Sequence, residues 1–224
     1  MTNIGAAKIE IQPKTRGGRP TKAAALERDE RLLSIAADMF MEFGFDGTSM
    51  ERLAETAMVG KATLYARYAD KGALFADVLR RKILTMYASL ESEFGEGLAE
   101  ENLEATLLIL ARRLLDVSLS PSSIALKRIL TAQSLRFPEL GRLVVDEGLC
   151  RQTNLLAGIF LRFAPTHRYA IDDLSLLAEL YFSIVMGWTS RLSQLGVAID
   201  REALDRRVRE AVKLFIRGAV VVGP

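Results

Sequence analysis

The sequence of 224 residues predicts an all-α protein, on two observations. Apolar residues recur at three- and four-residue steps from about residue 25 onward; for example, Ile35, Met39 and Phe43 share one face of a helix. Alternation of apolar and polar residues, the pattern of a half-buried strand, is nearly absent. Glycines, prolines and short polar turns separate nine expected helices, at about 26–43, 49–56, 60–67, 71–93, 99–118, 122–134, 138–163, 171–195 and 201–218.

The lengths of these helices predict two folded regions and an arm. Three short helices joined by tight turns fall within residues 25–75, and we expect them to form a small domain. The longer helices of residues 76–224 are expected to form a larger bundle. Residues 1–24 carry a net charge of +4, whereas the whole chain carries only +2, so a basic arm precedes a nearly neutral body. Such an arm either binds an anionic polymer or is simply a solvated tail.

Composition excludes several classes of protein. With one Cys and one His, the chain contains neither an internal disulfide nor a four-ligand zinc site of these residues, and we expect no metal and no cofactor. The basic start lacks an apolar signal region, and no apolar run reaches the roughly 20 residues that a bilayer requires, so a cytoplasmic protein without a membrane partner is expected. No phosphate-binding loop, zinc-protease motif or nucleophile elbow occurs, so we expect no catalytic residues and no enzyme.

Residues 48–68 show the pattern of a helix-turn-helix. Thr48 and Glu51 have the spacing of a capping box at the start of a helix, and Met50, Leu53 and Ala57 form its apolar face. A tight turn and a second short helix follow. The outward positions of that second helix are small, hydroxylated, aromatic or cationic and never acidic, as DNA phosphates require: Lys61, Ala62, Thr63, Tyr65, Ala66 and Arg67.

Residues 29–75 closely resemble the DNA-binding domain of the TetR family of bacterial transcriptional regulators. The matching segments are Phe40–Met50, Leu53–Ala57, Lys61–Tyr65, Arg67–Tyr68 and Asp70–Phe75. The resemblance implies that Lys61 and Ala62 face base edges, with Tyr65 as a further candidate for a base contact. It assigns to the phosphates, or to setting the register, the residues Thr48, Thr63, Tyr65, Tyr68 and Lys71; Arg67 joins this DNA-facing set from its outward position. Tyr68 has an alternative role as a core aromatic residue.

Two residues depart from the family pattern. Met58 occupies a turn position where the family usually has Gly, and a left-handed conformation there costs about 1–2 kcal/mol. Gly60 stands where Ser often caps the recognition helix, a difference of only a few tenths of a kcal/mol. In the arm, Arg16 and Arg19 lie in a Gly- and Pro-containing segment similar to an AT-hook, which predicts binding in an adjacent minor groove.

The resemblance also implies roles for the bundle, and residues 136–140 are similar to those of an AefR-like C-terminal domain. The last two helices are expected to form a homodimer interface through Leu177, Tyr181, Ile184, Val185, Leu204, Val208, Val212 and Phe215. The middle helices are expected to enclose a pocket for an unknown small-molecule effector, lined by Met86, Phe94, Leu110, Leu114, Ile129, Gln133, Leu155, Phe160 and Trp188.

The function expected from the sequence is that of a homodimeric repressor. It binds a palindromic double-stranded DNA operator and is released by a small molecule. An α-helical adaptor that binds another protein is the alternative, but it leaves the basic arm and the cationic second helix unexplained.

Overall fold

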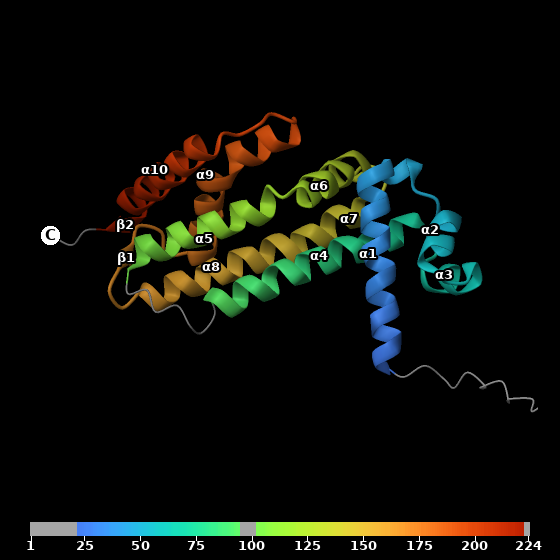
Figure 1. Cartoon of the computed structure of the whole chain (residues 1–224). Helices are drawn as coiled ribbons and strands as arrows, with labels where there is room; N and C mark the ends of the chain where they lie inside the picture. Colours follow the sequence, from blue (N-terminus) through green and yellow to red (C-terminus); the bar gives the residue numbers. More distant parts are fainter. Residues whose placement is uncertain (1–21, 95–101, 222–224) are drawn as a thin grey trace, which may run out of the picture.

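The computed structural model describes residues 22–94 and 102–221 and confirms the all-α prediction (Figure 1). The helices are α1 (Lys22–Gly47), α2 (Met50–Ala57), α3 (Lys61–Arg67), α4 (Lys71–Phe94), α5 (Leu103–Ser118), α6 (Pro121–Gln133), α7 (Pro138–Leu143), α8 (Cys150–Phe163), α9 (Leu174–Gln194) and α10 (Arg201–Ala219). Helices α1 to α3 lie at one end of an elongated molecule, and α4 runs from them into a bundle formed by the later helices. None of the described helices combines the length and apolarity that crossing a membrane requires.

Two details differ from the expected elements. The helix expected over 138–163 contains a π-helical turn, η1 (Val144–Leu149), between α7 and α8. In addition, β1 (Arg168–Tyr169) pairs antiparallel with β2 (Val220–Val221), which joins the loop before α9 to the end of α10. A two-residue strand is too short to produce a periodic pattern, so it could not be predicted from the sequence.

Gly44 ends the straight part of α1. Its backbone lies at φ 69° and ψ −179°, a region that side chains with a Cβ almost never occupy. The bend turns Phe45 back into the small domain, where its ring stacks on Phe40 at 5.8 Å and meets the edge of Phe75 at 5.8 Å. A single backbone conformation thus completes the aromatic core beneath α2 and α3.

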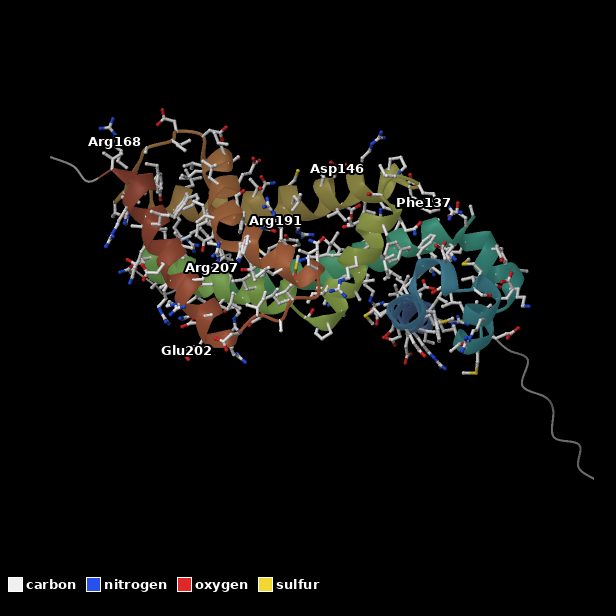
Figure 2. The ribbon with its side chains drawn as sticks, turned by 90° about the horizontal axis from the view of Figure 1, so that it is seen from above. Phe137, Asp146, Arg168, Arg191, Glu202 and Arg207 are labelled. Atoms are coloured by element: carbon white, nitrogen blue, oxygen red, sulfur yellow. The ribbon has the colours of Figure 1, made fainter. Side chains whose placement is uncertain are left out.

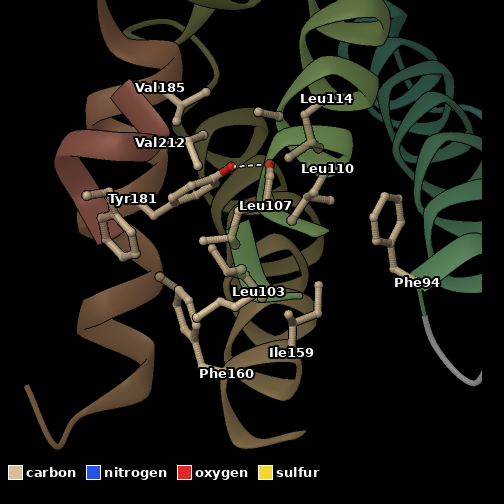
Figure 3. Packing of buried hydrophobic residues seen from close by; sticks show 14 of the residues in the cluster. Phe94, Leu103, Leu107, Leu110, Leu114, Ile159, Phe160, Tyr181, Val185 and Val212 are labelled. Atoms are coloured by element: carbon tan, nitrogen blue, oxygen red, sulfur yellow. Dashed lines mark hydrogen bonds between the residues drawn. The ribbon is translucent and has the colours of Figure 1, made fainter. Parts of the chain in front are cut away.

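The bundle has its own apolar core, built from α4, α5, α8, α9 and α10. Figure 3 shows Tyr181 of α9 at its centre, with its hydroxyl donating to the carbonyl of Leu107 on α5. Tyr181 is fully buried, and this bond satisfies the one polar atom of its side chain. Phe215 of α10 lies edge-on to the same ring at 5.1 Å, so three helices meet around one tyrosine.

The core of the small domain extends beyond residue 75. Leu126 of α6 and Leu140 of α7 are buried within it. Phe137, which Figure 2 shows at the junction of the bundle and the amino-terminal helices, contacts Phe45 at a ring distance of 5.3 Å. A Cβ on Gly72 would lie 3.0 Å from the Phe137 ring, so this close approach requires glycine. The two regions therefore share a packed boundary.

We expect Gly44→Ala to lower the free energy of unfolding by about 2 kcal/mol, because alanine must adopt a conformation reserved for glycine. An added Cβ would meet nothing within 4 Å, so the cost arises from the backbone and not from a collision. Urea denaturation measures it.

Gly141→Ala is the matched control, because its Cβ also meets nothing within 4 Å but its backbone in α7 is helical. We expect this variant to be stabilised by about 0.5–1 kcal/mol. Equal effects of the two substitutions would contradict the role assigned to Gly44.

Candidate nucleic-acid interface and ligand pocket

The start of α2 corrects the expected capping box. Ser49, not Thr48, is the N-cap: its hydroxyl accepts from the amide of Arg52 at 3.2 Å and donates to Glu51 at 2.9 Å. Thr48 is buried instead, and its hydroxyl donates to the carbonyls of Gly44 at 2.7 Å and Met39 at 3.2 Å. Thr48 and Ser49 are adjacent hydroxyl residues, and each lies at a plausible distance in sequence from the start of α2. Only the backbone conformation shows which of the two is the N-cap. The hydroxyl of Thr48 therefore holds the end of α1 in place, and the side chain is not on the surface.

Met58 adopts the left-handed conformation that its turn position requires, with φ 55° and ψ 41°. The amide of Val59 donates to the carbonyl of Ala54 at 2.9 Å, and the amide of Met58 donates to Glu55 at 3.2 Å. This pattern closes α2 and starts the turn into α3. The side chain of Met58 is 75% exposed, so little burial offsets the backbone cost.

Leu64 is the one buried residue of α3 and packs in the core of the small domain, and the other residues of the helix are exposed. Ala62 and Thr63 are exposed. Lys61 lies 3.5 Å from the carboxylate of Glu55, and the Tyr65 hydroxyl donates to Glu51 at 2.7 Å. The hydrogen bond from Tyr65 is the main reason that the pKa of Glu51 falls to about 2. Glu51 is therefore ionised at physiological pH and accepts the hydrogen bond from the Tyr65 hydroxyl, which fixes the ring on the surface.

Three other residues of the predicted DNA-contacting set have mainly internal partners. Tyr68 is buried in the core of the small domain, and burial raises its pKa to about 12, so the alternative role as a core aromatic residue describes it. The Lys71 ammonium donates to the carbonyls of Thr48 at 2.9 Å and Asp46 at 3.2 Å, which ties α4 to the turn after α1. Arg67 forms an ion pair with Asp29 of α1.

The sequence could not separate Thr48, Tyr68 and Lys71 from the surface set, because tyrosine, threonine and lysine serve either role. Arg16 and Arg19 of the arm lie outside the described residues.

A cavity of about 500 Å³ lies inside the bundle. Residues of α4, α5, α6, α8 and α9 line it together with η1, and half of these residues have apolar or aromatic side chains. Lys82, Lys127, Ser118, Ser123 and Gln152 are among its polar groups. A cavity of this size and apolar character is typical of small-molecule sites. The π-helical turn contributes Val144, Gly148 and Leu149 to the wall.

The structure corrects most of the predicted pocket lining. Met86 and Leu114 line the cavity, as expected. Phe94, Leu110 and Phe160 are instead fully buried in the bundle core of Figure 3, and Leu155 packs against that core. Ile129 packs against the core of the small domain, Trp188 is 52% exposed, and Gln133 lies at the end of α6, where its carbonyl accepts from Phe137.

Periodicity identifies apolar residues but does not separate a filled core from a cavity wall. The polar residues of the wall have no sequence signal of their own.

Two family models match the chain. The model for bacterial regulatory proteins of the tetR family matches residues 32–78, and the model for the C-terminal domain of AefR-like transcriptional repressors matches residues 105–218. The chain belongs to the TetR family of transcriptional regulators. Its sequence is also similar to the HTH-type transcriptional regulator RutR of Escherichia coli, with 38% identity over 86 residues. That match covers 38% of this chain and 39% of RutR, so it spans well under half of this curated relative.

Solved structures extend the similarity over nearly the whole chain. A TetR-family transcriptional regulator from Mesorhizobium loti is 26% identical with a TM-score of 0.81, covering 90% of this chain and 100% of the other. The flavonoid-responsive regulator FrrA is 27% identical with a TM-score of 0.72, covering 88% and 99%. The family and these neighbours are regulators and not enzymes. No three His, Cys, Asp or Glu side chains of residues 22–94 and 102–221 are grouped to hold a metal ion.

The last two helices of this TetR-family chain place the predicted interface residues mainly inside. Buried within the chain itself are Leu177, Tyr181, Val185, Val208, Val212 and Phe215. Leu204 is half-buried, and Ile184 is 37% exposed. The outward face of α9 carries Leu176, Leu180, Ile184 and Trp188, which follow one another at four-residue steps. The sequence did not indicate which face of α9 points outward, because α9 is apolar almost all round. Its periodicity therefore does not separate the face that packs in the bundle from the face that is exposed.

We expect Met58→Gly to raise the free energy of unfolding by about 1 kcal/mol, because glycine removes the cost of the left-handed conformation. Met58→Ala is the control. It removes the same exposed side chain but keeps the Cβ, so it should leave stability nearly unchanged. Denaturation of both variants in urea provides the comparison, and equal stabilisation by Gly and Ala would show that the side chain and not the backbone is responsible.

Proposed function

We propose that this TetR-family regulator is a repressor that acts in the cytoplasm as a homodimer. It binds a palindromic operator and leaves the DNA when a small molecule occupies the bundle cavity. The exposed face of α3 is the observation that carries the DNA-binding part of this proposal. Lys61, Ala62, Thr63 and Tyr65 lie on it side by side, and no residue of α3 is acidic. A helix with such a face fits the major groove, where lysine reads guanine and small side chains allow close approach.

The acidic partners of this face do not prevent DNA binding. The side chains of Lys61 and Glu55 are 55% and 70% exposed, and exposed ion pairs contribute about 0–1 kcal/mol. Lys61 can exchange Glu55 for a base or a phosphate at little cost. The bond from Tyr65 to Glu51 holds the ring in place before DNA arrives, which reduces the entropy lost on binding.

The basic arm adds a second contact in this proposal. Residues 14–22 reach about 30 Å when extended, enough to leave the major-groove face and enter the neighbouring minor groove. Arg16 and Arg19 are the residues that we assign to that groove, whose negative potential attracts arginine when it is narrow.

We expect Lys61→Ala and Tyr65→Ala each to weaken operator binding more than tenfold, since each removes a group from the groove-facing surface. Lys213→Ala is the matched control: Lys213 of α10 is another exposed lysine paired with a glutamate, at 3.2 Å from Glu210, but it lies far from α3. Fluorescence anisotropy with DNA from upstream of the gene measures the affinities. Unchanged binding by both α3 variants would reject α3 as the recognition helix.

The outward face of α9 supports the homodimer. Four large apolar side chains, exposed by 37–52%, form one stripe along α9, and Leu214 of α10 is 66% exposed beside the groove between the two helices. A stripe of this size is stabilised when a second copy covers it. Two copies related by a two-fold axis place two α3 helices on half-sites about 34 Å apart, which a single α3 cannot do.

We expect Leu180→Glu to convert the dimer to a monomer, because the substitution would bury a carboxylate in an apolar interface. Leu161→Glu is the control, since Leu161 of α8 is 66% exposed and lies outside the stripe. Sedimentation velocity gives the oligomeric state, and circular dichroism checks that both variants remain folded. A dimeric Leu180→Glu protein would place the interface elsewhere.

The cavity supports release by a ligand. Its wall includes α4 and α6, and both helices also contact the small domain. The related structure FrrA is described as flavonoid-responsive, which supports a small-molecule response in this chain as well. A ligand can cause release only if it binds the DNA-incompetent arrangement more tightly than the competent one.

A further inference from the structure

The charged groups that line the bundle cavity are all positive. Its described lining contains two lysines, Lys82 and Lys127, but no aspartate, glutamate or arginine. No carboxylate of residues 22–94 or 102–221 forms an ion pair with either lysine. Buried charges are usually paired, so a lysine of this cavity without a described carboxylate partner is suited to pair with an anionic group of a ligand.

Lys127 is the better placed of the two lysines. Its ammonium donates to the hydroxyl of Ser118 and, at 3.4 Å, to the carbonyl of the same residue, which leaves a third proton for a ligand. Burial lowers its pKa, with no neighbouring charge to offset the effect. Lys82 donates to Ser122 at 3.1 Å and also borders an outer groove that contains Glu93 and Asp116, so its charge is less isolated.

The rest of the wall is suited to an apolar body. Ile83, Met86, Leu114, Phe182 and Met186 surround the space next to the lysines. Methionine side chains adapt to ligands of different shape. A neutral apolar ligand would leave the Lys127 ammonium desolvated and without a counter-ion, whereas a cation would be repelled.

We propose that the cavity binds an amphipathic monocarboxylate, with the carboxylate on Lys127 beside Ser118 and the apolar body against the Met86, Leu114 and Met186 side chains. This inference rests on the proposed ligand response and names the chemical class of the effector. Both an aliphatic and an aromatic acid meet this description, so both skeletons are included in the test.

The experiment compares matched probes by isothermal titration calorimetry with the full-length protein. Decanoate is compared with decan-1-ol, and 2-naphthoate with 2-naphthamide. We expect at least one carboxylate to bind about tenfold or more tightly than its neutral partner, as a charge-assisted hydrogen bond implies. We further expect Lys127→Met to remove this preference while the neutral probe still binds, and Lys127→Arg to retain it.

Lys213→Met, a change of an exposed lysine on α10, is the control and should leave the preference unchanged. Equal binding of acid and neutral probe, an unaltered preference in Lys127→Met, or no binding by any carboxylate would overturn the proposal.

Operator binding is measured on the same preparations, with and without each probe. A protein that binds its operator but shows no carboxylate preference retains the proposed function and loses only this inference. A protein that binds decanoate through Lys127 but does not bind DNA would support the carboxylate site and contradict the proposed function.

Discussion

The packing of helix α6 constrains the rest of the structure, because its faces contact three different parts of the molecule: the small domain, the cavity and the end of α9. Leu126 is buried in the core of the small domain and also borders the cavity. Lys127 faces the cavity, and Arg128 donates to the carbonyls of Ser193 and Gln194 at the end of α9. Thirteen residues thus connect the proposed recognition, ligand and dimer surfaces. A rotation of α6 that alters one contact has to alter the others.

The boundary between α6 and the small domain is rigid for a reason visible in its composition. Phe45, Phe75 and Phe137 pack ring against ring, and Gly72 lets the Phe137 ring approach the start of α4. Close-packed interiors of this kind transmit displacement and deform little. A separate contact joins α4 to η1 within the bundle, because the guanidinium of Arg80 donates to both carboxylate oxygens of Glu147, at 2.9 and 3.1 Å.

The sequence predicted the helices well because their signals are local. Gly44 ends the straight part of α1, close to the expected end of the helix at residue 43, and Ser120, Asp173 and Asp200 cap the helices that follow them. The exposed face of α3 was predicted for the same reason, since one buried Leu64 fixes which residues of a seven-residue helix face outward. The packing inside the bundle could not be predicted in this way. The packing of helices that are distant in sequence decides whether Phe160 or Lys127 borders the cavity. It also decides whether Leu180 or Tyr181 faces the core, because α9 is apolar on both sides.

The half-buried Lys127 carries a desolvation cost, and this cost bears on how a ligand would act in the proposed response. Its ammonium has the hydroxyl and the carbonyl of Ser118 as partners, and none of the described carboxylates forms an ion pair with it. In the proposed ligand response, an anion would offset this cost in an arrangement in which Lys127 of α6 reaches it. Binding would then favour that position of α6, and Leu126 on the same helix, which is buried in the core of the small domain, would transmit the preference to the helices packed on that core. Because Leu126 and Lys127 are adjacent residues of one helix, a difference in ligand affinity between two positions of α6 would become a difference in the placement of the proposed recognition helices.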